Sequence, residues 1–171
     1  MARPPRHRLA DLASADLSPV ARPFFFGLPE AVATFIHIAD SERLRRAIME
    51  HINFPTDDML MFLAVNQLTL RGAMRATDLA AAVQTGRPNL SQVVRRLEEL
   101  DLVARAPDPD DNRGVLVLLT ERGRELGEAI VAYDMGTLEE CLEGWTPQER
   151  QLFGELFARV AKVMERRYPL G

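Results

Sequence analysis

An amphipathic segment followed at once by two strand-like runs constrains the fold more than any other part of the sequence. In residues 87–100, RPNLSQVVRRLEEL, the apolar side chains recur at the spacing of one buried stripe of an α-helix. Pro88 favours the first turn of that helix. The runs LVAR at 102–105 and VLVLL at 115–119 are apolar, partly β-branched and of strand length. Together they predict a helix beginning at Arg87 that leads directly into a β-hairpin.

Helical signals also precede this unit. Residues 29–51 predict one helix, because apolar positions recur through them at helical spacing. The hydroxyl of Thr56 is expected to cap a second helix that runs from Asp57 to about Leu70. Thr77 is expected to open a third, short helix, since an acidic residue follows it in the first turn and QTGRP soon ends the pattern.

Two further helices are expected after the hairpin. Thr120 predicts the start of a helix that runs to about Glu143, although each glycine within it lowers helical stability by about 1 kcal/mol relative to alanine. Thr146, Pro147 and Glu149 predict the start of the last helix, with a capping box between the threonine and the glutamate.

This order of elements is that of a winged helix-turn-helix, so the predicted fold class is mainly α (α+β). The major groove of B-DNA is about 12 Å wide and admits one α-helix, whose polar face then contacts base edges. The helix from Arg87 has an apolar stripe to hold it on its domain and a polar face rich in hydrogen-bonding side chains. A solvent-facing helix without such a role is the alternative for this segment considered by itself. The residues predicted to contact DNA, or to support that contact, are Thr77, Arg87, Asn89, Ser91, Gln92, Arg95, Arg96, Asp111 and Arg113.

The residues between the strand-like runs, APDPDDNRG at 106–114, predict a long loop in which one arginine accompanies several acids. Arg113 at its tip is expected to enter the minor groove, where the negative potential attracts arginine. Because unpaired carboxylates repel the phosphates of DNA, Asp111 is expected to hold Arg113 or a neighbouring arginine by a charge-assisted hydrogen bond. Asp108 and Asp110 are expected to serve the turn itself.

From Thr77 to Leu126 the sequence resembles the MarR-type transcriptional regulators. The D-P-x-D-x-R wing motif of that family is met by Asp108, Pro109, Asp111 and Arg113, and the following L-T-x-x-G-R segment by Leu119, Thr120, Gly123 and Arg124. Three residues depart from the family pattern: Gly86 and Asn89 at the start of the DNA-reading helix, and Asp101 after it. The first two mean that the operator sequence does not follow from the resemblance, and Asp101 is expected to strain a left-handed helix cap.

The resemblance implies a homodimer whose two winged domains straddle a pseudo-palindromic operator on double-stranded DNA. It divides the chain into an irregular N-terminal arm at 1–29, a winged helix-turn-helix DNA-binding domain at 71–119, and a helical dimerisation region at 30–70 and 120–171. The apolar face of the last helix fits a dimer, because an exposed face of that kind needs cover. The resemblance also implies a repressor that a small-molecule effector, aromatic or phenolic, releases from DNA. Residues considered for the effector pocket, none of them assigned, are Phe35, His37, Arg45, Phe62 and Tyr133.

Composition and the remaining motifs argue against other classes of function. The chain is 47% hydrophobic and 27% charged, and no apolar run is long enough to span a membrane. The lack of a signal peptide and the single cysteine favour the cytoplasm. No catalytic or nucleotide-binding motif is present and the histidines are isolated, so no enzyme, cofactor or metal site is predicted. Two alternatives stay open: a winged-helix module that docks a protein instead of DNA, and a redox switch at Cys141, although a free cysteine is mostly a small buried hydrophobe.

Overall fold

The computed structural model describes residues 27–109 and 111–168, without the side chains of residues 112 and 113. The chain divides into two compact units, one that ends at Ser41 and one that begins at Glu42. Up to residue 26, the predicted N-terminal arm lies outside the described residues.

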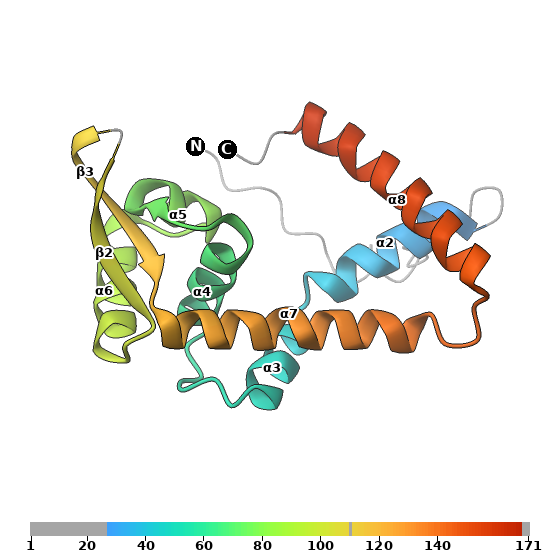
Figure 1. Ribbon diagram of the computed structural model, residues 1–171, viewed down its shortest axis with the longest axis horizontal. Helices are drawn as coiled ribbons and strands as arrows, with labels where there is room; N and C mark the ends of the chain where they lie inside the picture. Colours follow the sequence, from blue (N-terminus) through green and yellow to red (C-terminus); the bar gives the residue numbers. More distant parts are fainter. Residues whose placement is uncertain (1–26, 110, 169–171) are drawn as a thin grey trace, which may run out of the picture. The chain divides into compact units, whose positions relative to one another are not determined.

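The described chain is mainly helical with one small antiparallel sheet, which confirms the predicted fold class (Figure 1). The elements are α2 (Leu28–Ala39), α3 (Glu42–His51), α4 (Met59–Arg71), β1 (Met74–Arg75), α5 (Ala76–Ala82), α6 (Arg87–Glu99), β2 (Val103–Asp108), β3 (Asp111–Leu119), α7 (Glu121–Cys141) and α8 (Pro147–Arg167). The start of α6 at Arg87 and the starts of α7 and α8 after Thr120 and Thr146 agree with the sequence.

The single helix predicted over residues 29–51 is wrong, because the chain breaks between α2 and α3. The hydroxyl of Ser41 donates a hydrogen bond of 2.7 Å to the carbonyl of Ile38, and the amide of Asp40 donates to Ile36. Short polar side chains compete with helix continuation by bonding the nearby backbone. Apolar periodicity on both sides of the break conceals it in the sequence.

Two predicted helix starts are shifted. Asp58, and not Thr56, caps α4: its carboxylate accepts hydrogen bonds from the amides of Leu60 and Met61. The helix α5 begins at Ala76, with Arg75 as its N-cap residue and no side-chain cap, so the threonine expected to open it lies inside the first turn. Several candidate capping residues stand close together in both segments, and the tertiary contacts decide between them.

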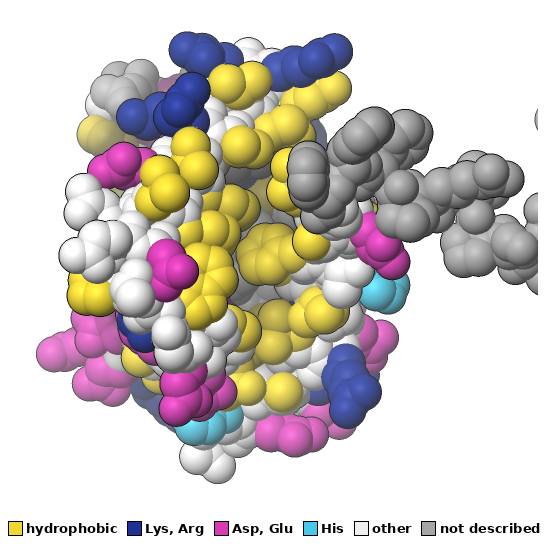
Figure 2. All heavy atoms as spheres, turned by 90° about the vertical axis from the view of Figure 1, so that its right-hand side faces the viewer, with side chains coloured by type: hydrophobic (Ala, Val, Ile, Leu, Met, Phe, Trp, Pro, Cys, Tyr) yellow, Lys and Arg dark blue, Asp and Glu magenta, His cyan; other side chains and the backbone are white. Residues whose placement is uncertain are grey.

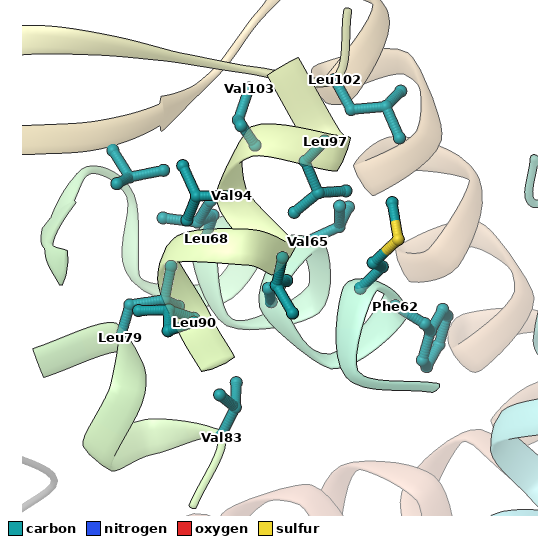
Figure 3. Packing of buried hydrophobic residues seen from close by; sticks show 14 of the residues in the cluster. Phe62, Val65, Leu68, Leu79, Val83, Leu90, Val94, Leu97, Leu102 and Val103 are labelled. Carbon is teal, nitrogen blue, oxygen red and sulfur yellow. The ribbon is translucent and has the colours of Figure 1, made fainter. Parts of the chain in front are cut away.

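The hydrophobic core of the larger unit lies where α4, α5 and α6 meet (Figure 3). Val65 and Leu68 of α4 lie in this core with Leu79 and Val83, whereas the ring of Phe62 packs against that of Phe54, and all of these side chains are buried. The apolar stripe of α6 packs into the same core with its residues Leu90, Val93, Val94 and Leu97. Burying each such side chain contributes roughly 1.5–3 kcal/mol, so the rotation of α6 about its axis is fixed by its apolar face.

The sheet has the strand order β1-β3-β2, and β2 and β3 form the predicted hairpin. Its loop is shorter than the sequence indicates. Pairing continues from Val103↔Leu119 to Pro107↔Val115 and, after a register shift, to Asp108↔Asp111. Much of the expected loop at 106–114 is therefore strand, because proline at an edge strand leaves most of the ladder with β3 intact.

The turn after α6 is fastened to the first turn of α7. Asp101 has a φ of 56°, the left-handed conformation expected of it. The hydroxyl of Thr120 donates a 2.6 Å hydrogen bond to the Asp101 carbonyl, the Thr120 amide donates to the carbonyl of Leu102, and the Arg122 guanidinium donates to that of Leu100. The same Thr120 hydroxyl accepts from the amide of Gly123 and so caps α7, as predicted.

Two glycines of α7 allow close packing, which explains why they stand in a helix. A Cβ on Gly123 would lie 2.0 Å from the carbonyl oxygen of Leu102, and one on Gly127 would lie 2.5 Å from the hydroxyl of Thr69. A Cβ on Gly136 would meet nothing within 4 Å. Of the three glycines of α7, Gly123 and Gly127 are therefore the ones that their surroundings require.

Replacing Gly123 by alanine should lower the free energy of unfolding by at least about 1–3 kcal/mol, because the new methyl group overlaps a backbone carbonyl that is itself hydrogen-bonded. Gly136→Ala is the matched control in the same helix and should stabilise by about 0.4–1 kcal/mol. Urea unfolding at one fixed protein concentration measures both. Equal midpoints for the two variants would contradict the close approach of α7 to the turn after α6.

Candidate nucleic-acid interface

The polar face of α6 is exposed while its apolar stripe is buried. Six residues of α6 that were predicted to contact DNA are exposed on this face: Arg87, Asn89, Ser91, Gln92, Arg95 and Arg96. A helix held by one face and open on the other meets the geometric condition for entering the major groove.

Several of these side chains have partners close by. The amide of Asn89 donates to the hydroxyl of Thr85 at 3.0 Å, and the hydroxyl of Ser91 donates to the carbonyl of Arg87 at 3.0 Å. Arg95 Nε lies 3.5 Å from Glu99 Oε1, and both side chains are well exposed. An exposed pair of this kind contributes about 0–1 kcal/mol, so Glu99 holds the Arg95 side chain only weakly.

Arg96 is placed differently from Arg95. Its Nη1 lies 3.4 Å from Oδ2 of Asp58, whose other carboxylate oxygen caps α4. This pair links α6 to the start of α4, and the expected contact of Arg96 with DNA stays a prediction. Thr77 is exposed in the first turn of α5, where its hydroxyl donates to Asp78 Oδ1 at 3.1 Å.

The hairpin β2–β3, which is the wing of the predicted fold, lies beside α6 (Figure 1). Arg105 of β2 links the two elements, since its Nε is 3.3 Å from Oε1 of Glu98. Residue 113 belongs to β3, but the side chain of Arg113 and the whole of Asp110 lie outside the described residues. The expected contacts of those two side chains therefore stay predictions.

The acids of the wing are paired with an arginine that the sequence did not single out. Arg75 of β1 donates from Nε to Asp108 Oδ2 at 2.7 Å, and its Nη2 lies 2.7 Å from that oxygen and 3.5 Å from Asp111 Oδ2. The hydrogen bond to Asp108, with the charge of that carboxylate, raises the pKa of Arg75 above its ordinary value. Arg75 therefore lies beside Asp111, and the expected contact of Asp111 with Arg113 stays a prediction.

The Asp108 carboxylate is buried in an ion pair that the sequence did not indicate, and its expected part in the turn stays a prediction. Arg75 lies 33 positions before Asp108 and outside the wing motif, so no local pattern reveals the pair. The surplus of carboxylates in the wing is the one signal in the sequence that a cation from elsewhere must approach it.

Other predicted sites are placed as follows. Cys141 is the last residue of α7 and its thiol is exposed, contrary to the expectation of a buried hydrophobe. Phe62 belongs to the core, which removes it from the candidates for an effector pocket.

Across residues 27–109 and 111–168, no three His, Cys, Asp or Glu side chains are grouped to hold a metal ion. Within the same residues, no helix is long and apolar enough to cross a membrane.

Comparison with known proteins identifies this architecture. The MarR family model matches residues 59–115, from α4 into the wing. The chain is 33% identical over 102 residues to the HTH-type transcriptional regulator YxaD of Bacillus subtilis, a match that covers 60% of this chain and 71% of the relative.

Solved structures have the same fold. A MarR family protein from Bacillus stearothermophilus superposes with a TM-score of 0.63 at 22% identity, over 80% of this chain and 94% of the other. NadR, solved in complex with 4-hydroxyphenylacetate, superposes with a TM-score of 0.53 at 24% identity, over 86% of this chain and 99% of the other. The chain therefore belongs to the MarR family and is a transcriptional regulator with a DNA-binding winged helix-turn-helix.

Proposed function

We propose that the protein is a homodimeric repressor that binds a pseudo-palindromic operator and is released from it by a small aromatic or phenolic molecule. The observation that carries the DNA-binding part is the division of α6 into a buried apolar stripe and an exposed polar face beside the wing. A twofold dimer presents two such helices to successive major grooves, about one helical turn of DNA apart. Occupation of a promoter by such a dimer excludes other proteins from it, which is the physical basis of repression.

In this proposal the chemistry of each exposed side chain determines whether it contacts a base edge or a phosphate. Arg95 and Gln92 contact base edges, since arginine suits guanine and glutamine suits adenine. Arg87, Asn89 and Ser91 at the start of α6, and Thr77 in the first turn of α5, contact phosphates or neighbouring bases. Arg113 at the wing reaches the minor groove. Arg96 and Asp111 support these contacts through their ion pairs.

The partner for the dimer is a second copy of the chain. The face of α8 that holds Phe153, Leu156, Phe157 and Val160 is apolar, and these residues are exposed in a single chain. Figure 2 looks onto the end of the molecule that carries α8, where hydrophobic side chains gather in a broad area. An apolar area of this kind marks a protein interface, and a symmetric dimer covers the same face on both copies.

An effector pocket is proposed between the end of α3 and the middle of α7. A hollow of about 480 Å³ is lined there by residues that include His51, Ile52, Tyr133, Thr137 and Glu140. The rings of His51 and Tyr133 meet edge to face with their centroids 4.8 Å apart. Its volume lies within the range of small-molecule sites, and aromatic walls with a few polar groups suit a phenolic ligand. The phenolic ligand in the NadR structure supports this class.

Arg95→Ala should weaken binding to the operator by about 1–3 kcal/mol and relax base preference at one position in each half-site. Arg113→Ala should weaken binding with a smaller effect on sequence choice, because the minor groove distinguishes fewer base pairs. Both are measured by gel shift over a salt series, on a duplex enriched from a random pool by the full-length protein. The control is Arg46→Ala, which removes a surface arginine paired with Glu42 on α3. Salt-independent binding, or equal specificity in all variants, would refute the assignment.

Leu156→Glu should make the protein monomeric at micromolar concentration, since it places a charge on the apolar face of α8. Analytical ultracentrifugation measures the mass in solution. Gln148→Glu adds the same charge at an exposed position in the first turn of the same helix, where a negative charge is favourable, and should leave the dimer intact. A Leu156→Glu variant that stays dimeric would show that α8 does not form the interface.

A phenolic effector should raise the melting temperature of the protein, because it binds the folded state selectively. At the same concentrations it should release the protein from DNA. With 4-hydroxyphenylacetate as the first probe, Tyr133→Leu should abolish the shift. Tyr168→Leu, which replaces the exposed tyrosine at the end of α8, should keep it. If the probe shifts neither the variants nor the parent protein, other benzoates and phenols are screened in the same assay. A shift that Tyr133→Leu preserves would place the pocket elsewhere.

A further inference from the structure

The wing is joined to the strand β1 by a side-chain contact as well as by backbone pairing. The backbone pairing of β1 with β3 ends at Arg75↔Leu116, so the outer part of β3 has only β2 beside it. The guanidinium of Arg75 extends the contact further out. It reaches Asp108, the last residue of β2, and Asp111, the first residue of β3. We call these three residues the Arg75 clamp.

The carboxylate of Asp108 is held in a space made for it. Its residue is 7% exposed, and it is the one charged residue that is buried within the described chain. Gly114 of β3 faces it so closely that a Cβ there would lie 2.8 Å from Asp108 Cβ and 2.9 Å from its Oδ2. A buried carboxylate is costly unless a cation and hydrogen bonds compensate it. Arg75 donates one hydrogen bond from Nε to Asp108 Oδ2, and its Nη2 lies 2.7 Å from the same oxygen as an ion pair.

The clamp acts at a mechanically weak point. A two-stranded hairpin is marginally stable by itself, and here a register shift between Pro107 and Asp108 interrupts its ladder near the turn. Arg75 is also the N-cap residue of α5, the first helix of the helix-turn-helix. The clamp therefore connects the end of the wing to the element that leads into α6.

The clamp also reduces the net negative charge at the base of the wing turn. Carboxylates beside DNA repel its phosphates, and two of them stand at the base of the wing turn. Arg75 lies within 4 Å of both, so its charge is directed to them. The wing can then approach a phosphate backbone without the full repulsion of its own acids.

We propose that Arg75 is a positioning residue for DNA binding, which fixes the wing relative to α6 so that Arg113 meets the minor groove. This inference rests on the minor-groove contact in the proposed function. Arg75 itself acts through Asp108 and Asp111 and does not bind DNA.

The test uses the full-length protein and the duplex enriched by it from a random pool. Arg75→Gln removes the charge at nearly constant size and should weaken binding about tenfold. Arg46→Gln makes the same charge change at the surface pair with Glu42 on α3 and should leave binding unchanged. Arg75→Lys keeps the charge and should recover part of the loss, because one ammonium replaces the fork of two N–H donors.

Methylation protection separates the two grooves, since dimethyl sulfate modifies guanine N7 in the major groove and adenine N3 in the minor groove. Arg75→Gln should lose the protection of adenine N3 under the wing and keep that of guanine N7 under α6. When it is combined with Arg113→Ala, binding should be no weaker than with Arg113→Ala by itself, because Arg75 acts through that residue.

Three results would overturn the proposal: Arg75→Gln binding as tightly as Arg46→Gln, full additivity with Arg113→Ala, or equal loss of protection in both grooves. All three leave the proposed repressor function standing. If Arg113→Ala itself keeps every minor-groove contact, the proposed wing contact fails and the role of Arg75 with it. Should Arg75→Gln not fold, Arg75→Gln combined with Asp108→Asn removes the buried charge as well, and the same comparisons apply.

Discussion

Burial of the apolar stripe of α6 is the interaction on which the rest of the structure depends. Leu90, Val93, Val94 and Leu97 all face the core that α4 and α5 complete. Successive residues of a helix are separated by about 100°, so a rotation of α6 by one position would move polar side chains into that core. The outward direction of Arg95 and its neighbours is therefore a consequence of the packing on the opposite side. A DNA-facing surface arises here without any interaction that selects it directly.

The sequence predicts features that depend on neighbours along the chain. The threonine caps of α7 and α8, the first residue of α6 and the left-handed Asp101 follow from local hydrogen bonds and backbone preferences. The break at Asp40 and Ser41 was missed because apolar positions continue on both sides of it. The glycines of α7 show the opposite error. Their helical penalty is visible in the sequence, whereas the backbone carbonyl that Gly123 accommodates is not.

The same distinction applies to the DNA-binding surface. The exposed positions of α6 could be predicted, because one helix determines which of its residues share a face. The partners of Arg96 and Asp108 could not, since Asp58 and Arg75 are distant in sequence and are brought near only by the packing of α4 and the pairing of β1. Side chains of the same type therefore differ in their partners: within α6, Arg95 pairs with Glu99 of the same helix and Arg96 with Asp58 at the start of α4.

The joint between α6 and α7 has a mechanical consequence. Hydrogen bonds from Thr120 and Arg122 reach the carbonyls of Leu100, Asp101 and Leu102, and Gly123 lets the backbones touch. With α7 about 30 Å long, a small sideways displacement at its far end becomes a tilt at this joint. Because Gly123 leaves no gap between the two backbones, a displacement of α7 would be transmitted to the turn that follows α6 and would not be absorbed between them.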